Sequence, residues 1–183
     1  PTFLAAAGAA VPTSMTGMSF LPLLQAHQTN GGQAQPFTGR KYVFCQRGAH
    51  GTGLPDSRSA FDLLRGVITE RYKLIYNALP QLPYAPIDIA NSNVWKHIGE
   101  LKAEGKLPSP FADIYHTPQR PMFELYDLAN DPAELNNLAG QSENALLERE
   151  LKVEISKWMV LERDFLPIPL IEKGNGGKNA GRK

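Results

Sequence analysis

The chain has 183 residues, of which 42% are hydrophobic and 20% charged, a composition typical of folded globular proteins and unlike that of disordered ones. Its 19 basic and 18 acidic residues leave a formal net charge of +1, so no broad electrostatic field favours nucleic acid or an anionic membrane as a partner. A single cysteine, Cys45, excludes an internal disulfide and a zinc site built from several thiolates. No apolar run approaches the ~18 residues that a membrane span needs.

The first 36 residues contain little that would form a core unaided. Residues 3–7 favour a short helix that Gly8 ends, and an apolar run at residues 19–24 leads into a polar loop around Gly31 and Gly32. A helix of this length is marginal alone, because helix nucleation is costly. We therefore expect the chain to begin inside a larger structure.

Residues 40–79 carry the signals of three β-strands. Residues 42–45 form a short apolar run, and residues 63–69 and 72–79 are rich in aromatic and β-branched side chains. In the last of these strands apolar and polar residues alternate, so one face is more polar than the other. Glu70 and Arg71 suggest a hairpin, although the pair lacks the glycine or asparagine that a two-residue turn prefers.

Residues 80–121 are rich in proline and predict mostly loop, because proline removes amide donors from regular ladders. Inside this segment Ser92 is predicted to cap a helix that runs to about Ala103, with Gly105 as its stop.

The last part of the chain predicts a strand and a long helix. The strand covers residues 122–128, and a short helical turn capped by Asp131 follows it. Ser142 is predicted to cap the long helix, which ends at about Arg163 and carries a favourable pair of Glu148 and Lys152. Its apolar stripe consists of Leu147, Leu151, Ile155 and Trp158.

These elements predict an α+β fold, a small antiparallel sheet of about four strands with the long C-terminal helix across one face. Both elements have one apolar side, and packing them together hides both sides. The glycine-rich residues 171–183 carry scattered lysines and arginines, and we expect a solvated, frayed terminus rather than a binding arm.

Common catalytic motifs are missing from the sequence. Ser19 lacks the second glycine of a nucleophile elbow, and the glycines at positions 48, 51 and 53 are not followed by the Lys-Ser or Lys-Thr of a phosphate loop. The four histidines, at positions 27, 50, 97 and 116, have no spacing typical of a compact metal site. Asp127 and Asp131 are better explained as caps than as calcium ligands.

One segment remains a candidate binding site. Residues 46–51 are expected to form a glycine-rich loop directly after the strand at residues 42–45, and this loop contains Arg47 and His50. A guanidinium and an imidazole at the end of a strand can bind an anionic ligand. The alternative is an ordinary solvent-exposed loop.

Several segments, read in order, resemble the carboxyl-terminal portion of the sulfatase family. PTFLAAAGAAVP and MTGMSFLPLL resemble the helix and turn near the end of its catalytic domain, YVFCQRGAHG a following strand and loop, and RGVITERYKLIYN its central hairpin. FELYDLANDPAELNNLA is similar to the late signature that precedes the terminal helix. The resemblance covers residues 1–169, and the insert at residues 80–121 is most similar to the heparan N-sulfatase (sulfamidase) branch.

The resemblance implies a parent enzyme that hydrolyses sulfate esters or N-sulfate groups, in a periplasmic, secreted or lysosomal location. Sulfatases use formylglycine, matured from cysteine or serine in a Cys-x-Pro-Ser-Arg type of motif, together with calcium. Cys45 is followed by Gln46, Arg47 and Gly48, so the chain lacks this motif and is expected to be inactive alone. The resemblance also places the loop with Arg47 and His50 at the active-site mouth, in contact with a sulfated sugar.

The implied organisation is a remnant of the catalytic domain at residues 1–36, the C-terminal subdomain at residues 37–170, and the tail at residues 171–183. The partner would be the missing N-terminal catalytic domain. Without it, apolar side chains of residues 1–24 are expected to be exposed and to promote self-association. They are Phe3, Leu4, Phe20, Leu21 and Leu23. The alternative is a stand-alone, non-catalytic module that binds glycans or proteins.

Overall fold

The computed structural model describes residues 1–29, 39–49, 61–84, 89 and 91–166. It divides into two compact units, Pro1–Arg40 and Lys41–Lys183. Within the described part of the chain, no helix combines the length and the apolar character needed to cross a bilayer.

The first unit contains two helices, α1 (Thr2–Ala6) and α2 (Leu21–Thr29). Gly8 follows α1 with a φ of +68°, the left-handed conformation that ends a helix, as the sequence predicts. The apolar run at residues 19–24 turns out to be the start of α2, and the loop around Gly31 and Gly32 lies outside the described residues. Of the five side chains predicted to be exposed, Phe3, Phe20 and Leu23 are exposed, whereas Leu4 and Leu21 are half-buried.

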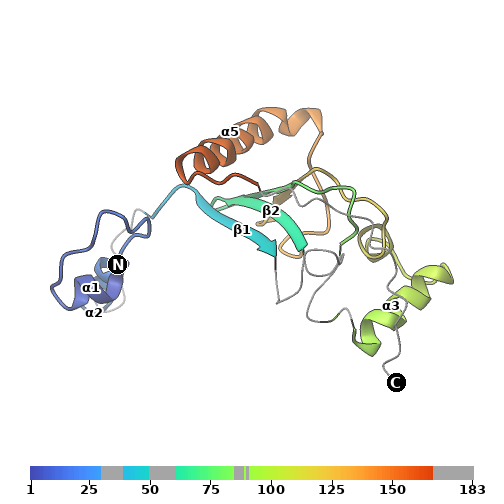
Figure 1. The fold of residues 1–183 in the computed structure, drawn as a ribbon, viewed down its shortest axis with the longest axis horizontal. Helices are drawn as coiled ribbons and strands as arrows, with labels where there is room; N and C mark the ends of the chain where they lie inside the picture. The colour runs from blue at the N-terminus through green and yellow to red at the C-terminus, as the bar shows by residue number, and fades with distance from the viewer. Residues whose placement is uncertain (30–38, 50–60, 85–88, 90, 167–183) are drawn as a thin grey trace, which may run out of the picture. The chain divides into compact units, whose positions relative to one another are not determined.

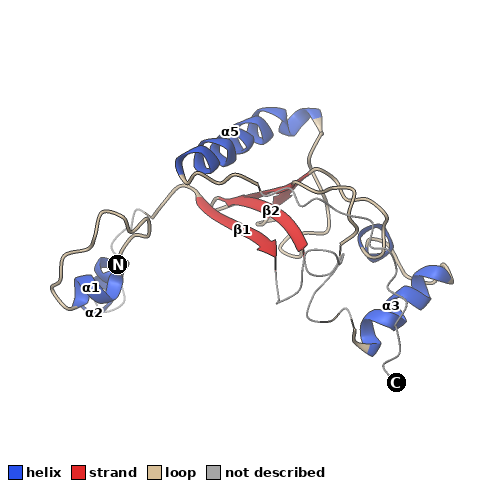
Figure 2. Cartoon of the chain, in the orientation of Figure 1, coloured by secondary structure: helices blue, strands red, loops and turns tan. Residues whose placement is uncertain are grey.

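The second unit is built on one antiparallel sheet in the order β1-β2-β3-β4. Figure 2 draws the strands in red and labels β1 and β2. Its strands are β1 (Val43–Ala49), β2 (Phe61–Ile68), β3 (Tyr72–Asn77) and β4 (Phe123–Asp127). The sheet and its helices confirm the predicted α+β fold class.

A threonine side chain stabilises the predicted hairpin between β2 and β3. The Thr69 amide donates to the Tyr72 carbonyl at 2.8 Å. The Thr69 hydroxyl oxygen accepts from the backbone amides of Arg71 and Tyr72 at 3.3 and 2.8 Å. The side chain therefore satisfies donors that a tight turn would otherwise leave unpaired, which explains why this hairpin forms without glycine or asparagine.

Helix α5 (Ala145–Leu161) lies along one face of the sheet and closes the core (Figure 1). Leu151 and Ile155 on the helix pack against three buried strand residues, Val67, Leu74 and Leu125. At the edge of this contact the Trp158 ring stacks on the Phe44 ring of β1, with the ring centroids 5.3 Å apart. The predicted apolar stripe of the helix is thus its contact with the sheet.

The structure differs from the sequence prediction at two caps. Ser142 lies in a short 3₁₀ turn, Ser142–Asn144, and no side chain caps α5, which begins at Ala145. Asp131 does accept from the amides of Leu135 and Asn136, at 3.1 and 2.8 Å, but the segment forms a turn and no helix. Glu134 has a φ of +55° in that turn, which a helix does not allow.

The proline-rich segment contains the predicted helix α3 (Asn93–Ala103) and a single further turn of helix, α4 (Phe111–Ile114). The Ser92 side chain caps α3 by accepting from the Trp95 amide at 3.1 Å. Gly105, with a φ of +68°, follows the C-terminal end of α3.

Two leucines of α5 provide a matched test of this core. Leu151 is 0% exposed and Leu146 is 84% exposed. We expect Leu151→Ala to lower the free energy of unfolding by about 2–5 kcal/mol, because it leaves a cavity against the sheet. Leu146→Ala should change it by less than about 0.5 kcal/mol. Urea unfolding followed by circular dichroism measures both, and equal effects would contradict the packing.

An ion pair joins the hairpin to the end of β4. Arg71 donates through Nε to Asp127 Oδ1 at 3.0 Å and through Nη2 to Asp127 Oδ2 at 2.7 Å. Asn130 also donates to Asp127 Oδ2, at 2.8 Å. The Arg71 hydrogen bonds lower the pKa of Asp127 from 3.8 to about 2, against the opposing effect of partial burial.

Because the folded-state pKa of Asp127 is the lower one, the stability that this group contributes is present above its ordinary pKa of 3.8 and is lost as the pH falls towards 2. We expect wild type to be more stable than Asp127→Asn above about pH 5, with the difference shrinking steadily below that value. Thermal unfolding of both proteins over this range tests it. A difference that is independent of pH would show that the charge of Asp127 does not matter.

Candidate functional site

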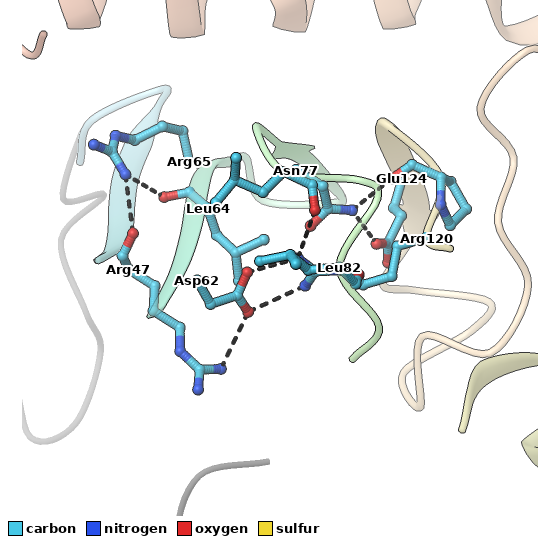
Figure 3. A network of polar contacts seen from close by, with 10 residues as sticks. Arg47, Asp62, Leu64, Arg65, Asn77, Leu82, Arg120 and Glu124 are labelled. Atoms are coloured by element: carbon cyan, nitrogen blue, oxygen red, sulfur yellow. Dashed lines mark hydrogen bonds and ion pairs between the residues drawn. The ribbon is translucent and has the colours of Figure 1, made fainter. Parts of the chain in front are cut away.

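The sheet has a second face, opposite α5, and this face carries charged and polar side chains (Figure 3). Side chains alternate along a strand, so residues that pair across strands share a face. Arg47 on β1 is opposite Leu64 on β2, and Leu64 is opposite Asn77 on β3. We call this side of the sheet the polar face.

The structure corrects the predicted position of Arg47. The sequence ended the strand at residue 45 and put Arg47 in a following loop, whereas β1 continues to Ala49. Gln46 and Arg47 pair with Arg65 and Leu64 through the backbone, which does not require apolar side chains. The pairing register shifts between Arg47 and Ala49, as it does at a β-bulge. The described residues of the predicted loop therefore form the irregular end of the strand. His50 lies outside the described residues.

A buried ion pair organises the polar face. Arg120 donates through Nη2 to Asp62 Oδ1 at 2.6 Å and through Nη1 to Asp62 Oδ2 at 3.1 Å. The side chains of Asp62 and Arg120 are only 9% and 6% exposed. Arg120 Nε donates to the Leu82 carbonyl at 3.1 Å, so three edges of the guanidinium are held by protein (Figure 3). This pair fixes the proline-rich segment to the start of β2.

Arg47 approaches the same carboxylate from the open side. Its Nη1 lies 3.8 Å from Asp62 Oδ2, and its side chain is 32% exposed. Asp62 is already bound at shorter distances by Arg120, so Arg47 gains only a weak ion pair. With respect to the residues that the structure describes, the Arg47 guanidinium therefore keeps donors that can bind an anion from solvent.

A second arginine holds the backbone of Arg47. Arg65 Nη1 donates to the Arg47 carbonyl at 3.0 Å and to the Leu64 carbonyl at 2.7 Å. Its Nε and Nη2 donate to the carboxylate of Asp164, just after α5, with the Nη2 bond at 2.8 Å. The hydrogen bonds from Arg65 lower the pKa of Asp164. Arg65 thereby joins the end of α5 to β1 and positions Arg47.

Sequence reasoning missed Asp62, Arg65 and Arg120. The partners are 58 residues apart in the Asp62–Arg120 pair and 99 apart in the Arg65–Asp164 pair. The sequence did carry one signal for such pairs. Arg65 lies within the predicted apolar strand at residues 63–69 and Asp62 lies directly before it, and charged side chains buried in such strands are almost always paired.

A cavity of about 510 Å³ lies on the β4 side of the polar face. Ile75, Glu124 and Tyr126 form its wall on the sheet. Arg120 and Tyr115 line it from the proline-rich segment, and Asn137 lines it from the turn after β4. Glu124 is held in place there, because Asn77 donates to it at 2.5 Å and Tyr126 at 2.6 Å.

The described residues do not fit a calcium site. No three or more histidine, cysteine, aspartate or glutamate side chains in this part of the chain are grouped so that they could hold a metal ion. His97 contacts Glu100 at 3.2 Å, and the His116 ring stacks on Trp95. Cys45 is an exposed free thiol on β1, and its sulfur lies where only a glycine, Gly66, fits on the neighbouring strand.

The amino-acid sequence was compared with protein-family models and with curated proteins. No protein-family model matches the chain. The chain is 29% identical, over 97% of its length, to an ulvan-active sulfatase of Formosa agariphila, of which it covers 32%. It is 35% identical, over 64% of its length, to another match, also an ulvan-active sulfatase of that organism, of which it covers 20%.

Solved sulfatase structures share the fold over most of the chain. A 2-O GAG sulfatase matches 90% of the chain with a TM-score of 0.53 at 20% identity. A putative sulfatase from Bacteroides thetaiotaomicron matches 90% with a TM-score of 0.54 at 21% identity. A protein solved in complex with its substrate D-glucosamine-2-N,6-O-disulfate matches 91% with a TM-score of 0.52 at 22% identity. The chain covers 24% of each solved chain.

The fold is therefore that of a subdomain found in sulfatases. The two curated relatives are both sulfatases, and the chain spans at most about a third of their length. The comparisons do not distinguish the sulfamidase branch from the others.

The two arginines that contact Asp62 should differ sharply in their effect on folding. Arg120→Ala leaves the Asp62 carboxylate buried without its main partner, and we expect a loss of about 3–5 kcal/mol in the free energy of unfolding. Arg47→Ala removes a long, partly exposed ion pair and should cost at most about 1 kcal/mol. Chemical denaturation of the two variants measures the difference. A large loss in Arg47→Ala would mean that Arg47 is a structural residue.

Proposed function

We propose that this chain is the C-terminal part of a sulfatase whose whole protein hydrolyses sulfate esters or N-sulfate groups of sulfated glycans. The observation that carries the proposal is the similarity to an ulvan-active sulfatase over 97% of this chain but 32% of that protein. The solved structures that share the fold support it, since one is described as a GAG sulfatase and another was solved with a disulfated glucosamine. The insert at residues 80–121 favours a sulfamidase-like enzyme within this class.

The proposal assigns the chemical steps and the substrate contacts to different parts of the protein. Formylglycine and calcium, which the family implies, would be supplied by the N-terminal catalytic domain. The described residues of this chain offer no matching metal ligands, and Cys45 is not followed by the maturation motif. This chain would complete the substrate pocket through the polar face of its sheet.

Arg47 is the proposed contact for a sulfate group, with His50 beside it in the sequence. The supporting geometry is a guanidinium that is 32% exposed and that, within the described part of the chain, is paired only weakly, at 3.8 Å from Asp62. The Arg65 hydrogen bond to the Arg47 carbonyl fixes the backbone at this position, and Asp62 lies near the guanidinium. Such a guanidinium can form charge-assisted hydrogen bonds to sulfate oxygens, which are stronger than hydrogen bonds between neutral groups.

In the whole enzyme, Arg47→Ala and His50→Ala should weaken substrate binding more than folding. A lost hydrogen bond to a charged group is worth about 1.5–3 kcal/mol, so we expect kcat/KM for sulfate release from ulvan oligosaccharides to fall about 10- to 100-fold, mainly through KM. Arg149→Ala is the matched control, because Arg149 is exposed on α5. Unchanged KM and kcat/KM in both variants would refute this role.

A separate experiment tests whether the chemical steps belong to the N-terminal catalytic domain and only the substrate contacts to this chain. The purified 183-residue chain should release no sulfate from ulvan oligosaccharides, whereas the whole protein should release it. Sulfate release by the chain alone would overturn the division. If the whole protein released none from any sulfated glycan yet bound glycans, the chain would instead be a non-catalytic binding module.

A further inference from the structure

The cavity beside β4 differs in chemistry from the surface around Arg47. Its volume of about 510 Å³ lies within the range of ligand pockets, roughly 300–1,000 Å³. It belongs to the same polar face as Arg47, because Arg120 lines the cavity and also binds the carboxylate that Arg47 approaches. Residues of the sheet form one wall and residues of the proline-rich segment form the other.

Aromatic rings give the cavity a rigid apolar wall. Tyr84 and Tyr115 both line it, with their ring centroids 6.2 Å apart. The Tyr115 ring is held between Phe111, at 6.1 Å, and Trp95, at 5.5 Å. Among the residues that the structure describes, none hydrogen-bonds the hydroxyl of Tyr84 or of Tyr115. Fixed aromatic faces with a polar tip suit a ring that is apolar on its face and polar at its edge.

The charged groups of the cavity are carboxylates or are already paired. Asp113, Glu124 and Glu134 line it, and Lys73 neutralises only Glu134, at 2.6 Å. Arg120 is bound by Asp62 and by the Leu82 carbonyl. A sulfate or carboxylate in this cavity would therefore face like charges, and Arg120, the cation among its described lining residues, is already paired, which disfavours an anion there. Hydroxyl groups, in contrast, can donate to carboxylate oxygens.

We propose that this cavity is a subsite for an uncharged, hydroxyl-bearing sugar residue of the same glycan whose sulfated residue is held at Arg47. The inference rests on the proposed function. Arg47 lies on β1 and Glu124 on β4, and these two strands are three strand spacings, or about 14 Å, apart across the sheet. A ligand that occupies both sites must therefore be an oligosaccharide. The subsite would select glycans by the position of their unsulfated sugar residues relative to the sulfated one.

Binding of chemically desulfated ulvan oligosaccharides to the whole protein tests the subsite. Wild type should bind them in isothermal titration. Tyr115→Ala should weaken binding about 2- to 10-fold, because it removes an aromatic face worth about 0.5–1.5 kcal/mol. Ala133→Trp fills the cavity from an exposed turn residue and should weaken binding at least as much while leaving the Tyr115 cluster in place. Arg149→Ala, an exposed position on α5, should leave this binding unchanged.

The outcomes separate the subsite from the proposed function. If wild type binds no desulfated oligosaccharide, or if Ala133→Trp binds it as wild type does, the subsite is refuted even when sulfate release is normal. If the whole protein releases no sulfate from any sulfated glycan, the proposed function fails whatever the titration shows. Ala133→Trp also guards against misfolding, since a Tyr115→Ala protein that does not fold leaves the cavity-filling variant to decide.

Discussion

The buried pair of Asp62 and Arg120 is the interaction on which the polar side of the sheet depends. Taking two charges out of water is expensive, and the pair recovers that cost only through good geometry and further hydrogen bonds. Arg120 has both, with two contacts to the carboxylate and one to the Leu82 carbonyl. The pair joins the proline-rich segment to the start of β2. Because Arg120 binds both oxygens of the Asp62 carboxylate closely, Arg47 makes only a distant contact with it, at 3.8 Å.

Arg65 plays the corresponding part on the other face. By binding Asp164 with one edge of its guanidinium and the Arg47 carbonyl with another, it ties the end of α5 to the edge strand. The helix is therefore fixed at its C-terminal end by charge and along its length by Leu151 and Ile155. Together the two arginines fix the surroundings of the partly exposed Arg47 guanidinium on the edge strand. One restrains the neighbouring carboxylate and the other restrains the backbone.

The elements that follow from local patterns could be predicted from the sequence. The alternation in β3, the stripe of α5 and the Ser92 cap are set by neighbours in the chain, and the structure has them where expected. The position of Arg47 within β1 could not be predicted, because backbone pairing extended the strand past its apolar residues. The segment after Asp131 forms a turn and not the predicted helix, because the Glu134 backbone adopts a left-handed conformation. The polar network and the cavity join residues distant in the sequence, so no local pattern reveals them.

The exposed thiol of Cys45 has a practical consequence. It is the chain's one sulfhydryl group and lies two residues before Arg47, on the same side of β1. A maleimide dye would therefore attach at one known place beside the guanidinium, without any engineered substitution. Its emission would report on ligands that reach this edge strand, and the neighbouring Gly66 leaves no other side chain at that point of the facing strand to interfere.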